Sequence, residues 1–445
     1  MDRPVSVGVL SLHSSKETKA IVNAIDDLGH DGIWLREDNL VVDVTNDGAT
    51  IEPDVDVIVN RLLLSKTEQP SELLGLAKSL SRLRPTLNRP EAVLPAFHKF
   101  ATATALADAD VRLPEAFLSL DADRLNEERA RFGDEVVFKT AIGTHGGGTW
   151  KIGRDELVNP RVGDRVAFLQ ELVEQDGETR HSDLRVYVVD DEIVAAMNRF
   201  APENDWRTNV ALGGDVEGVT DVPEAAAEMA LEAASVLGLD YAGVDLVRGT
   251  DGWYLLEVNP TAGFKGLFKA TGVSPAARIA RLAIETGGGD VDPAAVDRLE
   301  GVLDDSMPET VVREPSETEE SRKTIGYVED VLVSGTSGTE RVRSKSDTGA
   351  SRTSIDTRLA AKIGAGPIKS MTKVKSGSHK GGKSRPVVDI VVGIGGDRHT
   401  VQASLEDRGH MEYQLLLGRD ILSDYQVDVR RRSDATERAQ DEEEE

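Results

Sequence analysis

The first 90 residues alternate between short apolar runs and stretches that have the hydrophobic spacing of helices. Gly29 is placed to end the first helix, and the turn sequence Asn46-Asp47-Gly48 predicts a hairpin-like insert. This alternation indicates a small α/β layer on a parallel sheet, in which the sequence shows no candidate chemistry. Strands are predicted at residues 6–10, 32–35 and 55–60, and helices at residues 16–28 and 72–83.

Between residues 91 and 287 the pattern changes to strands joined by tight turns. The turn over Asp190-Asp191 joins two of these strands, and Gly249-Thr250-Asp251-Gly252 joins the last two. Consecutive strands joined in this way form hairpins. Helices are expected at residues 96–107 and 223–237, and strands at 115–118, within 135–150, and at 166–173, 183–189, 192–199, 244–247 and 253–258.

The last of these hairpins carries three candidate metal ligands. Asp245 lies on one strand, and Glu257 and Asn259 lie on the other, two residues apart and therefore on the same face. Their oxygen atoms suit Mg²⁺, which proteins usually hold by one or two carboxylates together with substrate phosphates. An exposed hairpin with ordinary surface acids explains the pattern equally well, because acidic residues are abundant in this chain.

A glycine-rich loop follows the strand that carries Lys139. The loop Gly143-Thr144-His145-Gly146-Gly147-Gly148 would let backbone N–H groups approach phosphates, and Lys139 would add positive charge. The loop lacks the Gly-Lys-Ser/Thr ending of a Walker A motif. Taken by itself, the loop is more simply interpreted as a glycine-rich hairpin turn. Lys99, on the predicted helix at 96–107, is a further candidate, although a single lysine on a helix is usually a solvated charge.

Arginine and asparagine side chains gather before the last hairpin. Arg185 lies on one predicted strand, and Arg207 and Asn209 lie in a polar loop. Arginine offers a fork of donors that binds carboxylate or phosphate with two hydrogen bonds. This segment therefore suits the binding of a carboxylate substrate.

Composition limits the possible classes of protein. A chain of 445 residues is long enough for about two to four domains. It has no cysteine, which excludes disulfides, thiolate metal sites and a cysteine nucleophile. Its formal net charge of −27 argues against general nucleic-acid binding and suits an acidic surface adapted to high salt. Without an apolar membrane span or signal-peptide pattern, we expect a cytoplasmic protein with no membrane partner.

Taken in order, these motifs resemble those of the ATP-grasp ligases, and most closely the RimK-type α-L-glutamate ligases and their lysine-biosynthesis relatives. The resemblance covers roughly residues 1–287 and implies a pre-ATP-grasp α/β domain at 1–90 and an α+β ATP-grasp domain at 91–287. The set that carries it is Lys99, Lys139 with the glycine loop, Gln170-Glu171, Asp183-x-Arg185, Arg207-x-Asn209, Asp245 and Glu257-x-Asn259-Pro260.

The resemblance also implies a role for each position. The carboxylate-orienting and catalytic residues would be Arg185, Arg207 and Asn209. The residues that bind ATP would be Lys99, Lys139, Gly146, Gly147, Gln170, Glu171 and Asp183. Mg²⁺, or alternatively Mn²⁺, would be held by Asp245, Glu257 and Asn259. Such an enzyme transfers the γ-phosphoryl group of ATP to a carboxylate, and an amine then displaces phosphate to form an amide.

Residues 288–323 are rich in Asp, Glu, Pro and Ser and are predicted to be an acidic linker, with a short helix at 294–303. Beyond it, residues 324–432 contain an Asp347-Thr348-Gly349-Ala350 turn and an apolar strand that ends in Leu-Gly-Arg-Asp. This pair of motifs resembles the retropepsin-like aspartic peptidases, an all-β barrel fold, and especially the group labelled ATP-dependent zinc proteases. Residues 433–445 are expected to be a disordered acidic tail.

The resemblance makes Asp347 the catalytic aspartate. Two such carboxylates are needed to activate water, so we expect at least a homodimer. A β-barrel without activity is the alternative. The histidines of this domain show no zinc-site spacing. A lysine-rich segment at 368–385 is expected to form a hairpin in the position of a peptidase flap. Its positive charge would attract acidic peptides. The alternative is a solvated lysine-rich loop without a binding role.

The function predicted for the whole chain is ATP-dependent addition of glutamate to the C-terminus of an acidic protein or peptide. The C-terminal domain would trim or bind the acidic tail. The alternative is a ligase that acts on an amino-group carrier protein or a small molecule, with a peptide-binding C-terminal module. The terminal sequence Asp441-Glu442-Glu443-Glu444-Glu445 also raises self-modification, although a solubilising acidic tail explains it more simply.

Overall fold

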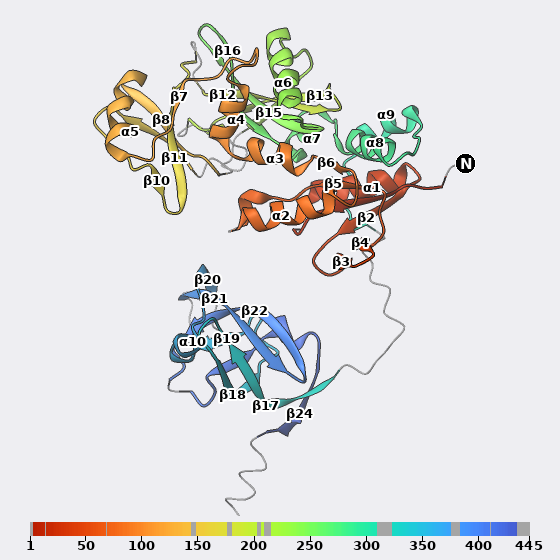
Figure 1. The fold of residues 1–445 in the computed structure, drawn as a ribbon, viewed down its shortest axis with the longest axis vertical. Helices are drawn as coiled ribbons and strands as arrows, with labels where there is room; N and C mark the ends of the chain where they lie inside the picture. The colour runs from red at the N-terminus through yellow and green to blue at the C-terminus, as the bar shows by residue number, and fades with distance from the viewer. Residues whose placement is uncertain are drawn as a thin grey trace, which may run out of the picture. The chain divides into compact units, whose positions relative to one another are not determined.

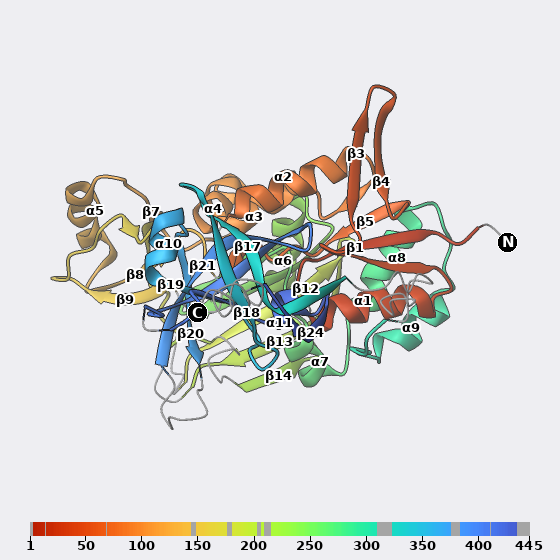
Figure 2. The same ribbon diagram turned by 90° about the horizontal axis from the view of Figure 1, so that it is seen from below.

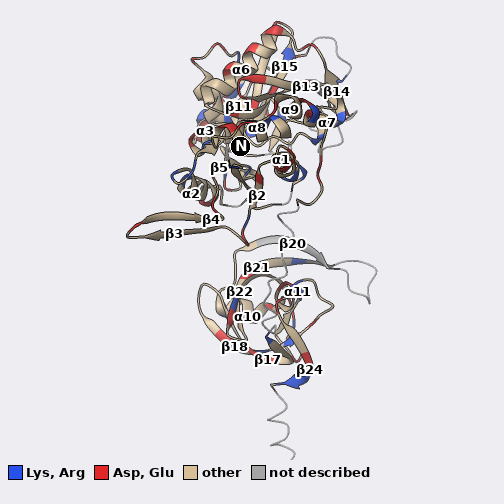
Figure 3. Ribbon diagram, turned by 90° about the vertical axis from the view of Figure 1, so that its right-hand side faces the viewer, with Lys and Arg blue, Asp and Glu red and all other residues tan. Residues whose placement is uncertain are grey.

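The computed structural model forms two compact units, Met1–Arg313 and Glu314–Glu445 (Figure 1). Acidic and basic residues are distributed along the elements of both units (Figure 3). Helices of the described residues are all too short or too polar to cross a membrane. The structure describes residues 3–13, 15–67, 69–143, 148–175, 180–202, 206–208, 215–308, 323–374, 383–409 and 411–433.

The N-terminal layer is a four-stranded sheet in the order β2-β1-β5-β6, and its strands are parallel, as predicted. Helix α8 comes from much later in the chain, and its apolar face, including Ile279 and Ile284, packs with α1 against this sheet. The predicted insert is the hairpin β3–β4, which projects from the layer (Figure 2). The elements are β1 (Ser6–Leu10), α1 (Lys16–Asp27), β2 (Asp31–Leu35), β3 (Val41–Thr45), β4 (Gly48–Glu52), β5 (Val57–Asn60), a 3₁₀ turn (Leu64–Lys66), α2 (Pro70–Ser81), β6 (Thr86–Leu87) and α8 (Ala276–Thr286).

Two further sheets follow. An outer sheet has the order β10-β11-β8-β9, with β7 paired to β11, and a central antiparallel sheet has the order β14-β13-β12-β15-β16. Helix α6 covers the central sheet through alanines, which allow close approach. The outer elements are β7 (Ala116–Phe117), α5 (Ala122–Glu128), a 3₁₀ turn (Arg129–Phe132), β8 (Glu135–Thr140), β9 (Thr149–Gly153), β10 (Arg161–Val162) and β11 (Arg165–Gln170). The central elements and their helices are α3 (Pro90–Phe97), α4 (Lys99–Leu106), β12 (Ser182–Val189), β13 (Glu192–Phe200), β14 (Asp215–Val219), α6 (Glu224–Leu237), β15 (Tyr241–Gly249), β16 (Gly252–Asn259) and α7 (Lys265–Thr271).

The first part of the predicted linker belongs to the first unit. Helix α9 (Pro293–Glu300) packs on α8 through the buried Val296. The Asn23 side chain donates to the carbonyl oxygens of Asp304 and Ser306 at 3.1 and 3.2 Å. The short helix predicted at 294–303 is therefore present as α9. The solvated tether that composition suggested does not begin at residue 288, because one buried apolar side chain and these hydrogen bonds attach the chain to the first unit as far as Ser306.

The second unit is built around a closed barrel of six strands, which confirms the all-β fold expected for this region. The strands run β17-β18-β23-β19-β22-β21 around the ring, and pairing of β21 with β17 closes it. The lysine-rich segment does form a hairpin, β20–β21, although most of its side chains lie outside the described residues. The elements are β17 (Thr324–Ser334), β18 (Thr339–Ser346), β19 (Ser354–Asp356), α10 (Thr357–Ile363), β20 (Ile368–Val374), β21 (Lys383–Ile394), β22 (Asp397–Glu406), β23 (Leu415–Leu417), α11 (Arg419–Leu422) and β24 (Gln426–Arg432).

Candidate active site

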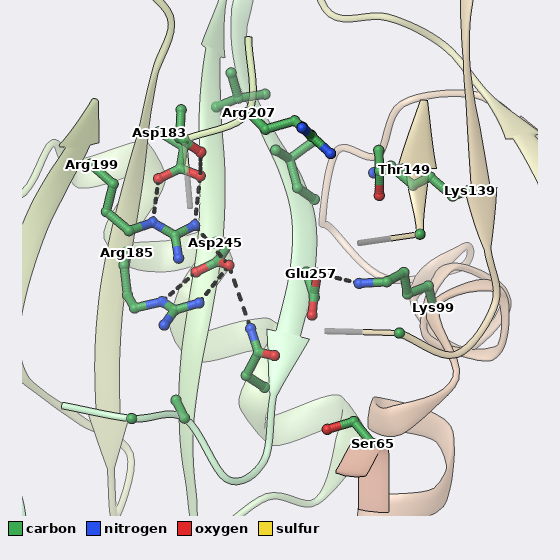
Figure 4. Close-up of a pocket in the computed structure, with 18 of the residues that line it drawn as sticks. Ser65, Lys99, Lys139, Thr149, Asp183, Arg185, Arg199, Arg207, Asp245 and Glu257 are labelled. Carbon is green, nitrogen blue, oxygen red and sulfur yellow. Dashed lines mark hydrogen bonds and ion pairs between the residues drawn. The ribbon is translucent and has the colours of Figure 1, made fainter. Parts of the chain in front are cut away.

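A cavity of about 490 Å³ lies in the first unit, and its N-terminal, outer and central sheets all contribute to the wall. The central sheet supplies residues of β12, β13, β15 and β16, and the outer sheet supplies residues of β8, β9 and β11. The loops that follow β1 and β5 supply the side of the N-terminal layer. The predicted ligase residues that the structure describes all line this cavity (Figure 4).

Charged side chains form a row across one face of the central sheet, which we call the charged row: Arg199, Asp183, Arg185, Asp245 and Glu257. Strand register creates it, because Asp183 lies opposite Arg199, Arg185 opposite Asp245, and Asp245 opposite Glu257. Arg199 binds Asp183 with two hydrogen bonds of 2.6 and 2.5 Å. Arg185 binds Asp245 in the same way, at 2.7 Å for both bonds (Figure 4).

Asp245 is the buried centre of the charged row. Its carboxylate also lies 2.9 Å from Nη2 of Arg199, so two guanidinium groups contact it. Burial would raise the pKa of Asp245, but Arg185 and Arg199 outweigh this and lower the pKa to about 2. Asp245 therefore carries a negative charge that fixes both arginines in place.

Glu257 is more exposed than Asp245 and faces the cavity. Its carboxylate pairs with the Lys99 ammonium group, and Lys99 is the first residue of α4. The predicted single helix at 96–107 is broken at His98, which leaves helical geometry and caps α4. The Asn259 carboxamide lies between Asp245 and Glu257. In one orientation its nitrogen donates to Asp245 Oδ2 at 3.4 Å, and in the opposite orientation the nitrogen donates to Glu257 Oε1 at 2.8 Å.

Lys139 enters the cavity from β8 and donates a hydrogen bond to the buried Gln170 on β11. Register explains this contact, because β8 and β11 are adjacent antiparallel strands. The pKa of Lys139 is lowered to about 8, chiefly by burial and also by the nearby Lys99 charge, while Glu257 and Asp245 act in the opposite direction.

We expect the affinity for ATP to fall as the pH rises above about 8. Phosphates would stabilise the charged form of Lys139, so binding takes up a proton between its pKa of about 8 and the higher pKa in the complex. In that interval the dissociation constant should increase by up to about tenfold per pH unit. ATP titrations between pH 7 and pH 10 measure this. Lys139→Arg should flatten the profile, and a flat profile in the unchanged protein would contradict the prediction.

The glycine loop and the edge of the outer sheet complete the predicted nucleotide side. Gly146 and Gly147 lie outside the described residues, whereas Gly148 lies so close to Thr140 that a Cβ atom would be 2.1 Å from its hydroxyl oxygen. Glu171 lines the cavity, but one of its carboxylate oxygens accepts from the backbone N–H of Glu115 at 3.0 Å.

The predicted carboxylate-binding loop is described only in part. Arg207 lines the cavity and projects into it in Figure 4, whereas Asn209 lies outside the described residues. Between them, the Thr208 hydroxyl group donates to Asp183. Asp183, which was predicted to bind ATP, thus holds Arg199 and Thr208 in this structure.

Comparison with known proteins identifies this arrangement. A RimK-like ATP-grasp domain model matches residues 96–283. A probable alpha-L-glutamate ligase of Stenotrophomonas maltophilia is 30% identical over 288 residues, covering 62% of this chain and 97% of the relative. The tetrahydromethanopterin:alpha-L-glutamate ligase of Methanocaldococcus jannaschii is 32% identical over 210 residues, covering 45% of this chain and 71% of the relative. The chain belongs to the RimK-like alpha-L-glutamate ligase family.

The fold of this RimK-like ligase also resembles that of a solved enzyme. The ATP-grasp ligase PsnB, complexed with a minimal precursor, superposes with a TM-score of 0.51 at 20% identity. The match covers 63% of this chain and 99% of PsnB. At this identity the likeness supports the fold alone, and it confirms the predicted ATP-grasp architecture.

ATP-grasp ligases use ATP and Mg²⁺, and the residues of this RimK-like site fit that pair. Among the described residues, no group of three or more His, Asp or Glu side chains is placed to hold a metal. Mg²⁺ is commonly held by few protein ligands together with phosphate oxygens, and Glu257 and Asn259 offer such ligands beside Lys99. Asp245 is engaged by two arginines, so its role as a third ligand stays a prediction.

Sequence reasoning missed one wall of the cavity. The N-terminal layer was expected to carry no chemistry, yet Glu17 and Arg61 line the cavity. They follow β1 and β5, which are neighbouring parallel strands whose carboxyl ends meet at one edge of the sheet. Ligands of open α/β sheets bind at this edge, but strand order cannot be obtained from one sequence. Arg199 was likewise left without an assigned role.

The second unit matches a model of retropepsin-like aspartic endopeptidase RimB over residues 360–438. This range includes Gly418-Arg419-Asp420 but begins after Asp347. Asp347 Oδ1 accepts from the backbone N–H groups of Gly349 and Ala350 at 3.0 and 3.2 Å. The two motifs meet, because Asp347 N–H donates to the Leu417 carbonyl group at 2.9 Å.

Proposed function

We propose that this RimK-like ligase adds glutamate to the carboxyl end of an acidic peptide or protein, driven by ATP. The observation that carries the proposal is the convergence of Lys99, Lys139, Arg207 and the charged row on one cavity. Cations for the transferring phosphoryl group and guanidinium groups for a carboxylate are what amide formation through an acyl phosphate requires. The glutamate ligases among its relatives support the choice of amino acid.

Each part of the cavity has a proposed role. Lys99 and Lys139 bind the ATP phosphates, with Gly146, Gly147, Gln170 and Glu171 on the nucleotide side. Mg²⁺ held at Glu257, Asn259 and Asp245 would offset phosphate charge, and Mn²⁺ would suit the same oxygen ligands. Asp245 holds Arg185 in place, and Asp183 holds Arg199. These two guanidinium groups orient the acceptor carboxylate. Arg207 and Asn209 contribute to the same task.

The reaction then needs no side-chain nucleophile. The acceptor carboxylate oxygen attacks the γ-phosphorus atom, the bond to the β-phosphate oxygen breaks, and ADP leaves. The neutral amine of glutamate attacks the carbonyl carbon of the acyl phosphate, an N–C bond forms, phosphate leaves, and the nitrogen loses a proton. The cations around the cavity stabilise the charge on the phosphoryl oxygens in both steps.

ADP release tests the proposal. Purified full-length protein is incubated with ATP, Mg²⁺, glutamate and a panel of acceptors, with ADP measured by a coupled assay and products by intact-mass spectrometry. Release that needs both glutamate and a peptide with an acidic C-terminus, with a mass gain of whole glutamyl residues, supports it. Release with a carrier protein or small molecule only, or with another amino acid only, would reject the proposed substrates. Intact-mass measurement of the protein after incubation with ATP and glutamate but no acceptor tests self-modification, and an unchanged mass would exclude it under these conditions.

For the second unit we propose an aspartic-peptidase site that trims the same acidic tails. Each chain supplies one Asp347, and its hydrogen bonds with the backbone hold the carboxylate on a tight turn. Two carboxylates that share one proton are needed to activate water, so the active form would be at least a homodimer.

Asp347→Asn should abolish cleavage of a polyglutamate-tailed peptide while leaving peptide binding largely intact. The amide cannot take a proton from water, but it keeps the size of the side chain. The exposed Asp330→Asn on β17 is the matched control. Cleavage is followed by mass spectrometry, and oligomeric state by sedimentation. Binding without any cleavage by the unchanged protein would assign the unit to peptide recognition instead.

A further inference from the structure

Arg61 is a buried cation that no described residue neutralises. Its exposed fraction is 3%, and within the described residues no carboxylate lies within 4.0 Å of it. Its Nη1 and Nη2 atoms lie 3.4 Å from the Ala262 carbonyl oxygen, the neutral Tyr187 hydroxyl group is a further neighbour, and Nε has no partner. Burial of a charge without a counter-ion is unfavourable, so a site of this kind suits an anion that arrives with a ligand.

Glu17 supplies the opposite charge a short distance away. It lines the same cavity, and a Cβ atom at Gly263 would lie 3.1 Å from its Oε1 atom. No described residue forms a hydrogen bond or ion pair with the Glu17 carboxylate, and it lies more than 4.0 Å from the Arg61 guanidinium group. Both residues therefore flank the short loop 261–263, with their charges unpaired.

A ligand with adjacent positive and negative groups complements this pair. Resting on the proposed function, we propose that Arg61 binds the α-carboxylate and Glu17 the α-ammonium group of the incoming amino acid. The loop 261–263 follows directly from Asn259 at the end of β16, and three residues span at most about 11 Å. Once its ammonium group has given a proton to Glu17, an amino acid held here lies close enough to the charged row for its neutral amine to attack an acceptor acyl phosphate bound beside Glu257.

A purely structural role for Arg61 predicts a different outcome. If Arg61 served to fix the loop 261–263, its replacement would destabilise the ligand-free protein. If Arg61 instead binds a substrate carboxylate, its replacement removes an unpaired buried charge. The stability of the ligand-free protein should then stay unchanged or rise, while binding of the amino acid is lost.

The test compares Arg61→Met and Glu17→Gln with the full-length parent. We expect the KM for the amino acid to rise on the order of 10- to 100-fold in Arg61→Met, and less in Glu17→Gln, with the KM for ATP unchanged. The parent should prefer glutamate over isoglutamine, whose α-carboxylate is an amide, and Arg61→Met should lose this preference. Arg129→Met is the matched control, because Arg129 is 5% exposed, has an unpartnered Nη1 and does not line the cavity.

The outcomes separate this assignment from the proposed function. If the parent turns over an amino acid other than glutamate, glutamate is rejected as the substrate, but the same comparison with that amino acid and its α-amide still tests Arg61. A rise in the KM for the acceptor alone, lost discrimination against glutamine instead of isoglutamine, or a loss of stability in ligand-free Arg61→Met would each overturn the assignment. If the parent shows no turnover, amino-acid binding measured by calorimetry must still be lost in Arg61→Met.

Discussion

Replacement of Glu257 by glutamine should lower ATP-dependent turnover about 100- to 1,000-fold without loss of the fold. Glu257 has the most exposed carboxylate of the charged row, and Lys99 is its partner in the cavity. Loss of a single preorganised charged group beside a transferring phosphoryl group has effects of this size. The amide keeps an oxygen atom but loses the negative charge that positions Lys99 and suits Mg²⁺.

Stability separates this catalytic effect from misfolding. The Glu257 side chain is 28% exposed, and partly exposed ion pairs contribute at most about 1 kcal/mol, so the denaturation midpoint should change little. Asp251→Asn is a suitable control, because Asp251 lies in the turn of the same hairpin and forms an exposed pair with Arg112. ADP release at saturating ATP and chemical denaturation provide the two measurements. Full activity in Glu257→Gln would remove this residue from the proposed mechanism.

The sequence was sufficient to predict that Asp245, Glu257 and Asn259 lie together. The turn at residues 249–252 fixes which strands pair, and spacing of two along a strand fixes the face. The turn alone would place Asp245 opposite Leu256. A one-residue irregularity between Asp245 and Leu246 instead brings Asp245 opposite Glu257, with Gly243 opposite Asn259. Local patterning also predicted the parallel N-terminal sheet, because alternating strands and helices leave few arrangements.

The partners of Asp245 could not be predicted in the same way. Arg185 reaches Asp245 only because β12 pairs with β15, two strands that are distant in the sequence, and Arg199 depends on the further pairing of β13. Arg61 could not be singled out from the sequence either, because there it is simply an arginine that follows a short apolar run. Its significance depends on its burial and on the approach of loop 261–263, and both are properties of tertiary packing.

Asp245 is buried and bound by two arginines, whereas Glu257 is partly exposed, so we expect the largest loss of stability when Asp245 is replaced. Asp245→Asn should destabilise the first unit by about 3–5 kcal/mol, because it leaves buried arginines without their counter-charge. Arg199 retains Asp183, but Arg185 loses both hydrogen bonds of 2.7 Å to a carboxylate and remains only 14% exposed. Denaturant unfolding of the full chain at pH 7, followed through the tryptophans of the first unit, measures the change.

Two comparisons make the prediction specific. The double variant Asp245→Asn with Arg185→Met should recover part of the lost stability, because no unpaired guanidinium group remains at that position. Because the folded-state pKa of Asp245 is lowered to about 2, its stabilising charge is complete above pH 4 and is lost as the pH falls toward 2. The gap between parent and Asp245→Asn should therefore narrow in that range. A variant as stable as Glu257→Gln at pH 7 would show instead that Asp245 is not needed to hold the arginines, and would leave metal binding as its principal role.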